Sequence, residues 1–453
     1  MSGERERLKA IGARVLSEAN DLKRTSEALA KELGWALPEV KAVIAGEAPV
    51  EVAERLLHAI AAAYPVSLPD LWVERDDTDG GVRLMTARES ARSARVFERP
   101  DRGGSLTPYY EYRDTAMSRM APFKPEWIEE LRVVRSEAAD DPDVAFNKGH
   151  FLHQTTFFIG PVNFYWELNS RRHVALLDTG DSNYITPFVP HSFASRDPAR
   201  KGLIIAVTYA AGVRLALEDF SRISAADAEA LAGDLRDPRQ ARRARIARNL
   251  AMESLGPDGF AAALGRMGVD PGRARAILDG DAPQERELAS CAAILNVSPA
   301  DLVVVPLEPA QEVVVRRRSD HAGRLYPDAG EATYRITELA RARHQPQLKG
   351  FDVEVLSGSG GEFRHGLHEY VYNYGDSGVD LHWGAGRSAA LEPGDSAYVR
   401  PMTAHRFARR SGQAPGRLAV IRIPGRLTTP VLDEFAAMSA GRRRVSGETE
   451  RWF

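Results

Sequence analysis

HFLHQTTFFIGPVNFYW, residues 150–166, and GDSNYITPFVPHSF, residues 180–193, decide the fold because both stretches recur in the second half of the chain. Their counterparts are HGLHEYVYNYGDSGVDLHW at 365–383 and GDSAYVRPMTAHRF at 394–407, and the pair Tyr112-Arg113 matches Tyr334-Arg335. These stretches alternate apolar and polar residues, are rich in Tyr, Phe and Val, and are interrupted by Gly and Pro, as strands and turns are. Several short strands that close on one another predict a small β-barrel or jelly roll in each half.

Segments with helical periodicity precede both strand-rich regions and also match each other. Residues 25–60 read as a helix–turn–helix–helix unit with turns at Gly34 and Gly46, and residues 260–302 have the same layout. The matching motifs are IAGEAP (44–49) with ILDGDAP (277–283), which aligns Gly46 with Gly280, and SLPDLW (67–72) with SPADLV (298–303). The chain is therefore predicted to repeat one plan, a helical unit followed by a β-barrel.

Domain boundaries are placed where the composition changes. The predicted segments are a helical unit at 1–78, a barrel at 79–235, a second helical unit at 236–308, a second barrel at 309–430 and a C-terminal tail at 431–453. The basic stretch RDPRQARRARIARN (236–249) is predicted to be a solvated helix, the alternative being a contact with the tail or a partner. The tail is predicted to be an exposed or docking extension.

Composition excludes several classes of protein. The 453 residues carry 60 basic and 63 acidic side chains, a net charge of −3, which argues against a strongly basic nucleic-acid binder. The single cysteine, Cys291, cannot form a disulfide framework or a Cys-based metal site within one chain. No apolar run approaches the ~20 residues of a membrane span, and the charged start MSGERERLKAIG is unlike a signal peptide. We expect a soluble, cytoplasmic protein that binds neither nucleic acid nor membrane, with the oligomeric state left open, a homo-oligomer included.

The residues that carry chemistry lie in the predicted barrels. In the first barrel, His150 precedes Gln154 by four positions, and His191 lies in the next repeated stretch. Residues i and i+4 of a strand point to the same face, so a His on a later strand can complete a facial set of three ligands. Such a set leaves three positions open and suits a non-haem Fe(II) that binds substrate and O₂ together. We therefore predict a metal site with His150, Gln154 and His191 as ligands.

The second barrel carries His365, Glu369 and His405 at the same positions. The order of His, three residues, Glu or Gln, and a later His that follows a Gly-Asp pair resembles the cupin superfamily. The fold class predicted on this resemblance is α+β, a tandem repeat of a helix-turn-helix-like helical unit plus a cupin β-barrel, that is, a bicupin.

Good donors to a phosphate-like oxyanion are concentrated in the first half. They are Lys23 in NDLKRT, Arg102, the aromatic cluster Tyr109-Tyr110-Glu111-Tyr112, and Asn147 in NKGH. The second half has Glu362 where the first has Asn147, and Pro257 where the first has Lys23. The first barrel is therefore predicted to be catalytic, and the second site is predicted to be vestigial or structural, although its ligand types would suit a metal.

These motifs resemble the phosphonate-processing cupin oxygenases, which include hydroxyethylphosphonate dioxygenase, methylphosphonate synthase and, more distantly, hydroxypropylphosphonate epoxidase. NDLKRT (20–25), YYEY (109–112), NKGH (147–150) and PFVPHSF (187–193) carry the resemblance, which covers nearly the whole chain. In the dioxygenase branch a Glu ligand stands six residues before the second His, where this chain has Ile185. In the synthase branch a Gln stands four residues after the first His, as Gln154 does here. The resemblance therefore favours the synthase branch.

The resemblance implies an Fe(II)- and O₂-dependent cleavage of 2-hydroxyethylphosphonate to methylphosphonate and carbon dioxide. It implies that Lys23, Arg102, Tyr110 and Asn147 bind the phosphonate, with Lys23 and Tyr110 also in catalytic roles, and it leaves open whether Tyr110 or Tyr112 faces the ligand. The alternatives are the dioxygenase reaction, which gives hydroxymethylphosphonate and formate, a ligand-sensing helix-turn-helix–cupin transcription regulator, and a metal-dependent sugar-phosphate isomerase. The regulator has thin support, because its candidate recognition segments at 36–48 and 270–280 carry few basic residues for phosphate contacts.

Overall fold

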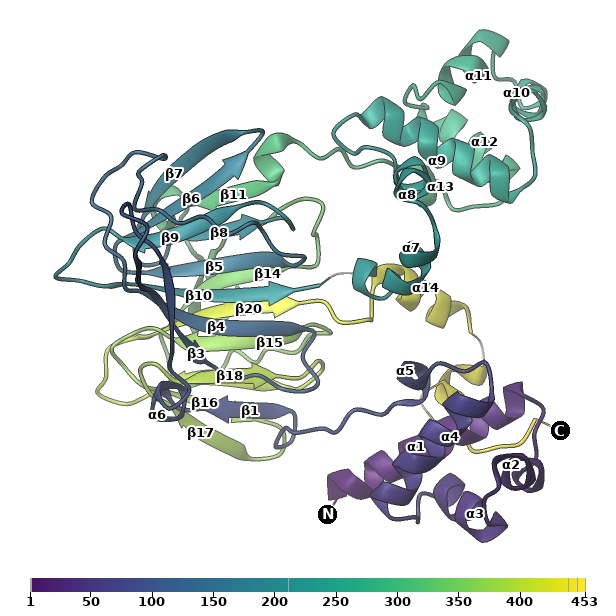
Figure 1. The fold of residues 1–453 in the computed structure, drawn as a ribbon, viewed down its shortest axis with the longest axis horizontal. Helices are drawn as coiled ribbons and strands as arrows, with labels where there is room; N and C mark the ends of the chain where they lie inside the picture. The colour runs from purple at the N-terminus through teal and green to yellow at the C-terminus, as the bar shows by residue number, and fades with distance from the viewer. Residues whose placement is uncertain (1, 211, 439, 446, 453) are drawn as a thin grey trace.

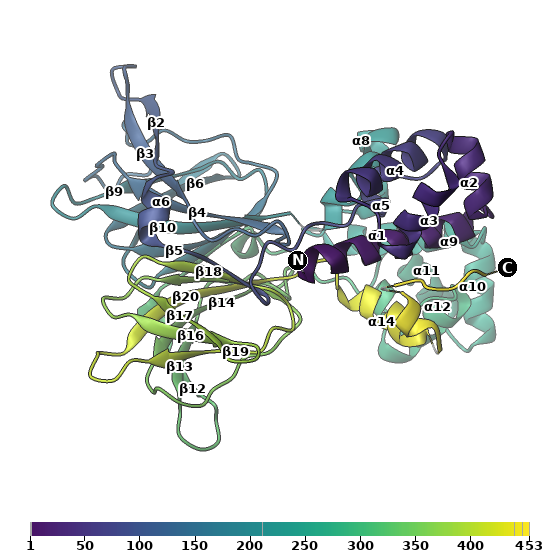
Figure 2. The same ribbon diagram turned by 90° about the horizontal axis from the view of Figure 1, so that it is seen from below.

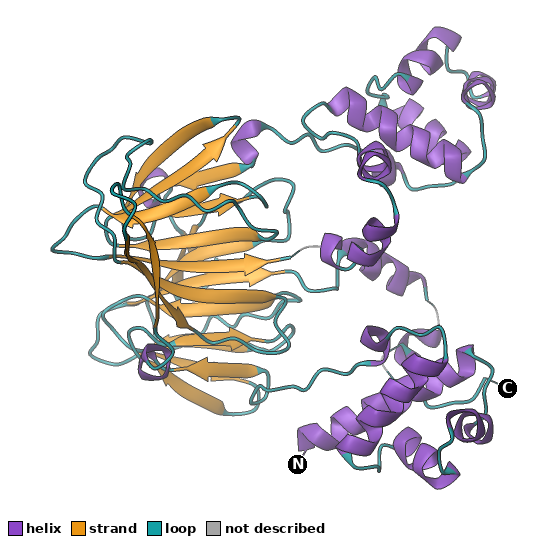
Figure 3. Ribbon diagram, viewed as in Figure 1, coloured by secondary structure: helices purple, strands orange, loops and turns teal. Residues whose placement is uncertain are grey.

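The protein has a mixed α/β structure in which four β-sheets form one part and two helical units lie on one side of it (Figures 1 and 2). The computed structural model describes residues 2–210, 212–438, 440–445 and 447–452. Figure 3 shows that helices and strands are segregated, since almost all helical segments lie outside the sheet region.

The N-terminal helical unit contains five helices. They are α1 (Ser2–Asp21), α2 (Ser26–Leu33), α3 (Leu37–Ala45), α4 (Val50–Ala63) and α5 (Leu68–Leu71). The Thr25 hydroxyl caps α2 by accepting a hydrogen bond from the Ala28 N–H, and Gly34 and Gly46 end α2 and α3 with positive φ, as the sequence predicts. Helix α1 precedes the predicted repeat, and it completes the buried core of this unit through Ile11 and Val15.

The second helical unit follows the same plan. Its elements are α9 (Pro238–Met252), α10 (Pro257–Arg266), α11 (Pro271–Leu278), α12 (Glu285–Ile294) and α13 (Pro299–Leu302), preceded by the linking helices η1 (Gly212–Arg214), α7 (Leu217–Arg222) and α8 (Ala225–Ala232). The basic stretch is the helix α9, which buries Ala241, Ile246 and Leu250 and leaves its arginines half-buried or exposed. The predicted solvated helix is confirmed, and the structure adds that one face of it is buried.

Strands supply the rest of the fold. In the first half they are β1 (Val82–Met85), β2 (Arg95–Pro100), β3 (Leu106–Asp114), β4 (Phe123–Glu130), β5 (His153–Ile159), β6 (Val162–Leu168), β7 (Arg171–Leu177), β8 (Ser182–Ile185), β9 (His191–Ser195) and β10 (Gly202–Tyr209), with the short helix α6 (Ala87–Ala91). In the second half they are β11 (Val313–Arg316), β12 (Arg324–Tyr326), β13 (Tyr334–Glu338), β14 (Lys349–Val355), β15 (His368–Asn373), β16 (Val379–Trp383), β17 (Arg387–Leu391), β18 (Ser396–Val399), β19 (His405–Arg409) and β20 (Gly416–Ile423). The helices η2 (Pro309–Gln311), η3 (Arg318–Asp320), α14 (Thr429–Ala437) and η4 (Ala440–Arg444) complete the chain.

The two seven-stranded sheets have corresponding strand orders. One runs β11-β8-β5-β10-β4-β3-β2 and the other β1-β18-β15-β20-β14-β13-β12, and each half adds a three-stranded sheet, β7-β6-β9 or β17-β16-β19. Apolar side chains fill the space between the large and the small sheet of each half. The large sheets also pack on each other, because Phe157, Tyr184 and Ile205 of one share a buried cluster with Tyr370 and Ile421 of the other.

The register corrects one detail of the sequence alignment. The Tyr334 hydroxyl accepts a hydrogen bond from the Phe407 N–H, and the Tyr110 hydroxyl accepts the matching bond from Phe193, both at 3.0 Å. Tyr334 therefore corresponds to Tyr110, so the pairing of Tyr112-Arg113 with Tyr334-Arg335 was wrong. The shared dipeptide misled because it lies two residues out of register, a shift that leaves the alternation of faces unchanged.

One strand of each half pairs with the large sheet of the other half. Strand β1 is the first strand of the first half but pairs with β18 of the second, with Val82 opposite Val399. Strand β11 is the first strand of the second half but pairs with β8 of the first, with Val313 opposite Ile185. The segments 79–235 and 309–430 are thus joined by an exchange of their first strands.

The C-terminal tail docks on the N-terminal helical unit. The side chain of Asn20 is fully buried; its Nδ2 donates to the Glu450 carbonyl at 3.0 Å, and its Oδ1 accepts from the Trp452 N–H at 3.3 Å. Arg451 donates to the Ser26 hydroxyl at 2.7 Å. The described residues 447–452 thus contact the helical unit, although most of them stay exposed. Among the described residues, every helix is too short or too polar to cross a lipid bilayer.

Replacement of Asn20 by Ala will lower the free energy of unfolding by about 1–3 kcal/mol, because the two hydrogen bonds from this fully buried side chain to the tail backbone are lost. Urea unfolding followed by circular dichroism measures the change. The matched control is the same substitution in a chain that ends at Gly447, where Asn20→Ala will cost measurably less. An equal cost in both chains would contradict a role in holding the tail.

Candidate active site

A cavity of about 200 Å³ lies inside the first half, between the large sheet and β9. Its lining residues are Arg99, Tyr110, Tyr112, Glu126, Ile128, Ala145, Asn147, His150, Leu152, Gln154, His191, Phe193 and Thr208. The three predicted metal ligands therefore meet at one cavity, and the predicted substrate residues Tyr110 and Asn147 join them.

His191 begins β9 and is almost completely buried. Its Nδ1 lies 2.9 Å from the Val189 carbonyl, which can only accept, so Nδ1 carries the proton. The Nε2 therefore keeps a lone pair that can bind a metal or accept a hydrogen bond. Burial lowers the pKa of His191 to about 4 although the Val189 carbonyl opposes that shift. The imidazole is therefore neutral at pH 7, as a metal ligand must be.

Gln154 is held with its oxygen toward His150. The Gln154 Oε1 lies 3.1 Å from the His150 Nε2, and the Gln154 Nε2 donates to the Thr156 hydroxyl at 2.9 Å. Thr156 lies two residues further along β5 and hence on the same face. Its hydroxyl fixes the orientation of the carboxamide. The 3.1 Å spacing is close to the roughly 3 Å expected between adjacent ligand atoms that each lie about 2.1 Å from one octahedral ion.

Asn147 fixes the loop that presents His150. Its Oδ1 accepts the N–H groups of Gly149 and His191, and its Nδ2 lies 3.1 Å from the His191 Nε2. Gly149 has φ +75°, and a Cβ there would meet the Phe188 backbone at 2.4 Å. Asn147 therefore has a structural role, and its amide nitrogen faces the position a ligand would take.

The structure distinguishes the two tyrosines of the cavity. The Tyr110 hydroxyl accepts from the Phe193 N–H and lies 3.1 Å from the Ser192 hydroxyl. In the described part of the chain, no hydrogen bond reaches the Tyr112 hydroxyl. Burial raises the pKa of both phenols, so both are protonated donors at pH 7. Tyr112 is the one with a free hydroxyl at the cavity.

Two predicted substrate residues lie elsewhere. Lys23 follows α1; its ammonium donates to the Asn20 carbonyl at 3.0 Å and lies 5.3 Å from the centre of the Trp452 ring. Arg102, in the β2–β3 turn, is exposed and forms an ion pair with Asp143. Neither residue lines the cavity, so a single chain does not bring them to the site. Arg99, three residues before Arg102, lines it instead.

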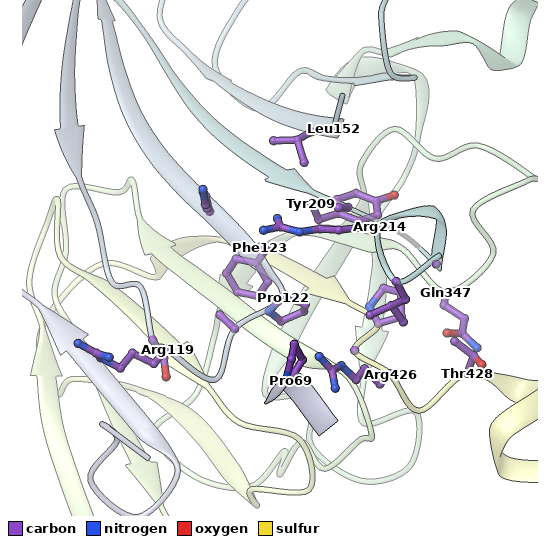
Figure 4. Close-up of a pocket in the computed structure, with 18 of the residues that line it drawn as sticks. Pro69, Arg119, Pro122, Phe123, Leu152, Tyr209, Arg214, Gln347, Arg426 and Thr428 are labelled. Atoms are coloured by element: carbon purple, nitrogen blue, oxygen red, sulfur yellow. The ribbon is translucent and has the colours of Figure 1, made fainter. Parts of the chain in front are cut away.

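A second, larger cavity of about 2070 Å³ adjoins the first. Leu152 and Thr208 line both cavities. Figure 4 shows Leu152 and Tyr209 together with Arg119, Arg214 and Arg426 around this space. Lys124 also lines it, and it stands opposite Thr208 in the β4–β10 pair with no salt bridge to any described acidic residue. The larger cavity also has acidic lining residues, among them Asp76, Asp77 and Glu218. Among its basic side chains, Lys124 is the one that pairs across the strands with a residue that the two cavities share.

The second half contains a comparable cluster. Glu369 is fully buried, with its Oε2 3.0 Å from the His365 Nε2 and its Oε1 2.8 Å from the His405 Nε2. Arg422 Nε donates to the same carboxylate at 2.5 Å. Burial raises the pKa of Glu369, but the Arg422 guanidinium and the two imidazoles outweigh that and hold the pKa well below its usual value. Glu369 is therefore ionised.

No protein-family model matches the chain, but an individual relative does. Methylphosphonate synthase from Nitrosopumilus maritimus is 34% identical over 452 residues, which cover 98% of this chain and 95% of the relative.

The chain belongs to the methylphosphonate synthase family.

Solved structures extend the comparison of this methylphosphonate synthase family member. HEPD from Streptomyces albus, solved with its substrate 2-hydroxyethylphosphonate and Fe(II) bound, matches with a TM-score of 0.88 and 32% identity over 99% of both chains. PhpD with cadmium, complexed with hydroethylphosphonate, matches with a TM-score of 0.74 and 19% identity over 96% of this chain and 98% of that one, which shows a shared fold. The family resemblance read from the sequence is confirmed.

Several cavity residues escaped the sequence analysis. Lys124 and Glu126 lie two residues apart on one face of β4, and two charges on the same face of a mostly buried strand are a usable signal for an interior polar site. Thr156 was hidden because its role, fixing the Gln154 amide, is visible only as a hydrogen bond. Arg99 gave no signal that separates it from Arg95 and Arg102.

Replacement of Thr156 by Val will weaken metal binding by roughly 10–100-fold, because the Gln154 carboxamide loses the bond that orients its oxygen. Titration of the metal-free protein with Co(II), followed by the absorption of the bound ion, measures the affinity. Thr155→Val is the matched control, since that hydroxyl lies on the other face of β5 and donates to the Asn183 carbonyl. Equal affinities for the two variants would rule out the orienting role.

Proposed function

We propose that this chain catalyses the Fe(II)- and O₂-dependent cleavage of 2-hydroxyethylphosphonate to methylphosphonate and carbon dioxide, with water as the remaining product. The relative that bears the synthase name matches over almost its whole length, and HEPD of S. albus binds the same substrate and Fe(II). The reaction balances with one O₂ per substrate, so no second reductant is required.

The observation that carries the synthase assignment is the orientation of Gln154. Its oxygen faces His150 at the cavity, whereas Ile185, at the position of the dioxygenase ligand, is a fully buried apolar residue of the core. Two imidazoles and a carboxamide oxygen form a neutral facial set that fits a divalent first-row metal. Bound Fe(II) would supply open positions at which substrate and O₂ bind together.

The protein's own residues would bind and shield the substrate. A phosphonate carries nearly two negative charges, and we propose that Arg99, Tyr112 and Asn147 donate hydrogen bonds to it at the cavity. Lys124 lies at the approach from the larger cavity, where its ammonium would attract the dianion. Ile128, Leu152 and Phe193 are the apolar lining that excludes water from the reacting atoms.

Glu126 is an acidic side chain that lines the cavity. Burial raises its pKa, and Arg95 and His150 oppose that shift only in part. A neutral Gln ligand leaves a bound Fe(II) with one more unit of positive charge than a Glu ligand would. An ionised Glu126 carboxylate would offset part of that charge from the cavity wall.

We further propose that each half is a cupin barrel preceded by a helix-turn-helix-like unit. Support comes from the corresponding strand orders of the two large sheets and from the equivalent hydrogen bonds of Tyr110 and Tyr334. The first barrel is the proposed catalytic one, because Asn147, Arg99 and Tyr112 are found there.

The direct test is product analysis. Protein purified without oxygen, supplied with Fe(II), 2-hydroxyethylphosphonate and O₂, will give methylphosphonate in the phosphorus NMR spectrum without added 2-oxoglutarate. Hydroxymethylphosphonate with formate would instead assign the chain to the dioxygenase reaction. Absence of turnover would remove the proposed function.

Replacement of His150 or His191 by Ala will lower turnover by more than about 100-fold. Removal of a metal ligand reduces activity more than removal of a residue that only hydrogen-bonds to a ligand. Far-ultraviolet circular dichroism will show the fold retained. His365→Ala, the same substitution at the corresponding position of the second half, is the control and will retain most of the activity. A greater loss in His365→Ala would place catalysis in the second half.

A further inference from the structure

The second half contains three side chains of metal-ligand type that the proposed function does not use. The ligand atoms of His365, Glu369 and His405 all lie within 4.8 Å of one another. By residue type alone this set suits iron better than the first set, because it includes a carboxylate where the first has an amide. What distinguishes the two sites must therefore lie beside the ligands.

The difference is at one position of the neighbouring strand. In the first half, Gln154 on β5 stands opposite Thr208 on β10, and in the second half Glu369 on β15 stands opposite Arg422 on β20. Directly opposite residues of an antiparallel pair point to the same face. Thr208 lines the first cavity, so Arg422 enters the corresponding interior of the second half.

Arg422 is held firmly in that interior. Its Nε donates to the Glu369 Oε2 at 2.5 Å, and its guanidinium carbon lies 5.0 Å from the centre of the Phe363 ring and 5.2 Å from that of Phe351. Only 17% of its side chain is exposed. Both aromatic faces attract the cation and leave it little room to withdraw.

Both oxygens of the Glu369 carboxylate already have partners. Its Oε1 lies 2.8 Å from the His405 Nε2, and its Oε2 lies 3.0 Å from the His365 Nε2 and accepts a hydrogen bond from the Arg422 Nε. A divalent ion there would lie beside a guanidinium that cannot lose its proton, in a buried place where like charges repel strongly. The first site has the reverse arrangement, because the register places Glu126 where the second half has Phe351.

We infer that Arg422 takes the place of a metal ion in the second half. The site is closed to divalent metals by this one side chain rather than by any defect in its ligands. It follows that a small neutral residue at position 422 opens a second metal site, and that the natural chain holds one metal ion, in the first half.

The first experiment counts ions in the full-length protein. Chains loaded with Co(II) and freed of excess ion by gel filtration will contain one equivalent by elemental analysis. The His191→Ala variant will contain no Co(II), and the His405→Ala variant will still contain one Co(II) per chain. The inference is wrong if the His191→Ala chain still binds one ion and the double variant His191→Ala/His405→Ala binds none.

The second experiment opens the site. In the His191→Ala background, Arg422→Thr, which copies Thr208, will raise the count from none to one, with the absorption of Co(II) bound by His and carboxylate. Arg422→Lys is the matched control and will stay at none, since it keeps a cation. A folded Arg422→Thr chain, as judged by circular dichroism and thermal unfolding, that binds no ion would overturn the inference. Because both experiments count ions, their result is independent of whether the protein makes methylphosphonate.

Discussion

The antiparallel pairing of a ligand-bearing strand with its central neighbour is the constraint on which the rest of the site depends. It determines that the residue four positions after the first His faces the interior at the same level as one residue of β10 or β20. In one half that pair is Gln and Thr, which leaves a cavity. In the other it is Glu and Arg, which fills the interior with an ion pair. One backbone arrangement thus supports two different chemistries, and the choice between them is made by two side chains.

Much of this fold was predictable because its signals are local and occur twice. The glycines that end helices, the alternating strands and the two His-containing stretches each appear in both halves, and each repetition supports the other. His150, Gln154 and His191 could be assigned to one site because strand periodicity puts i and i+4 on one face. Asn147 was found by its position three residues before His150, and the structure adds that its side chain accepts the N–H groups of Gly149 and His191 and so fixes the loop.

The failures have physical causes. Alternation cannot be followed through β2, because a bulge shifts the register between Phe97 and Glu98, so nothing local indicated that Arg99 rather than Arg102 reaches the interior. Lys23 was placed by motif alone, whereas its ammonium donates to the Asn20 carbonyl and lies over the ring of Trp452, a residue far away in the sequence. The difference between Thr208 and Arg422 was within reach, since GLIIAVTY (202–209) and GRLAVIRI (416–423) align once the repeat is extended to the last strand.

The exchange of β1 and β11 has a consequence for how such a molecule can arise and be divided. A separated first half would leave the edge of β8 bare, and a separated second half would leave the edge of β18 bare. Bare edges of this kind are covered most readily by the same strand from another molecule. A precursor with the sequence of one half alone would therefore have been a dimer with exchanged strands, and joining two copies end to end would place that exchange within one polypeptide.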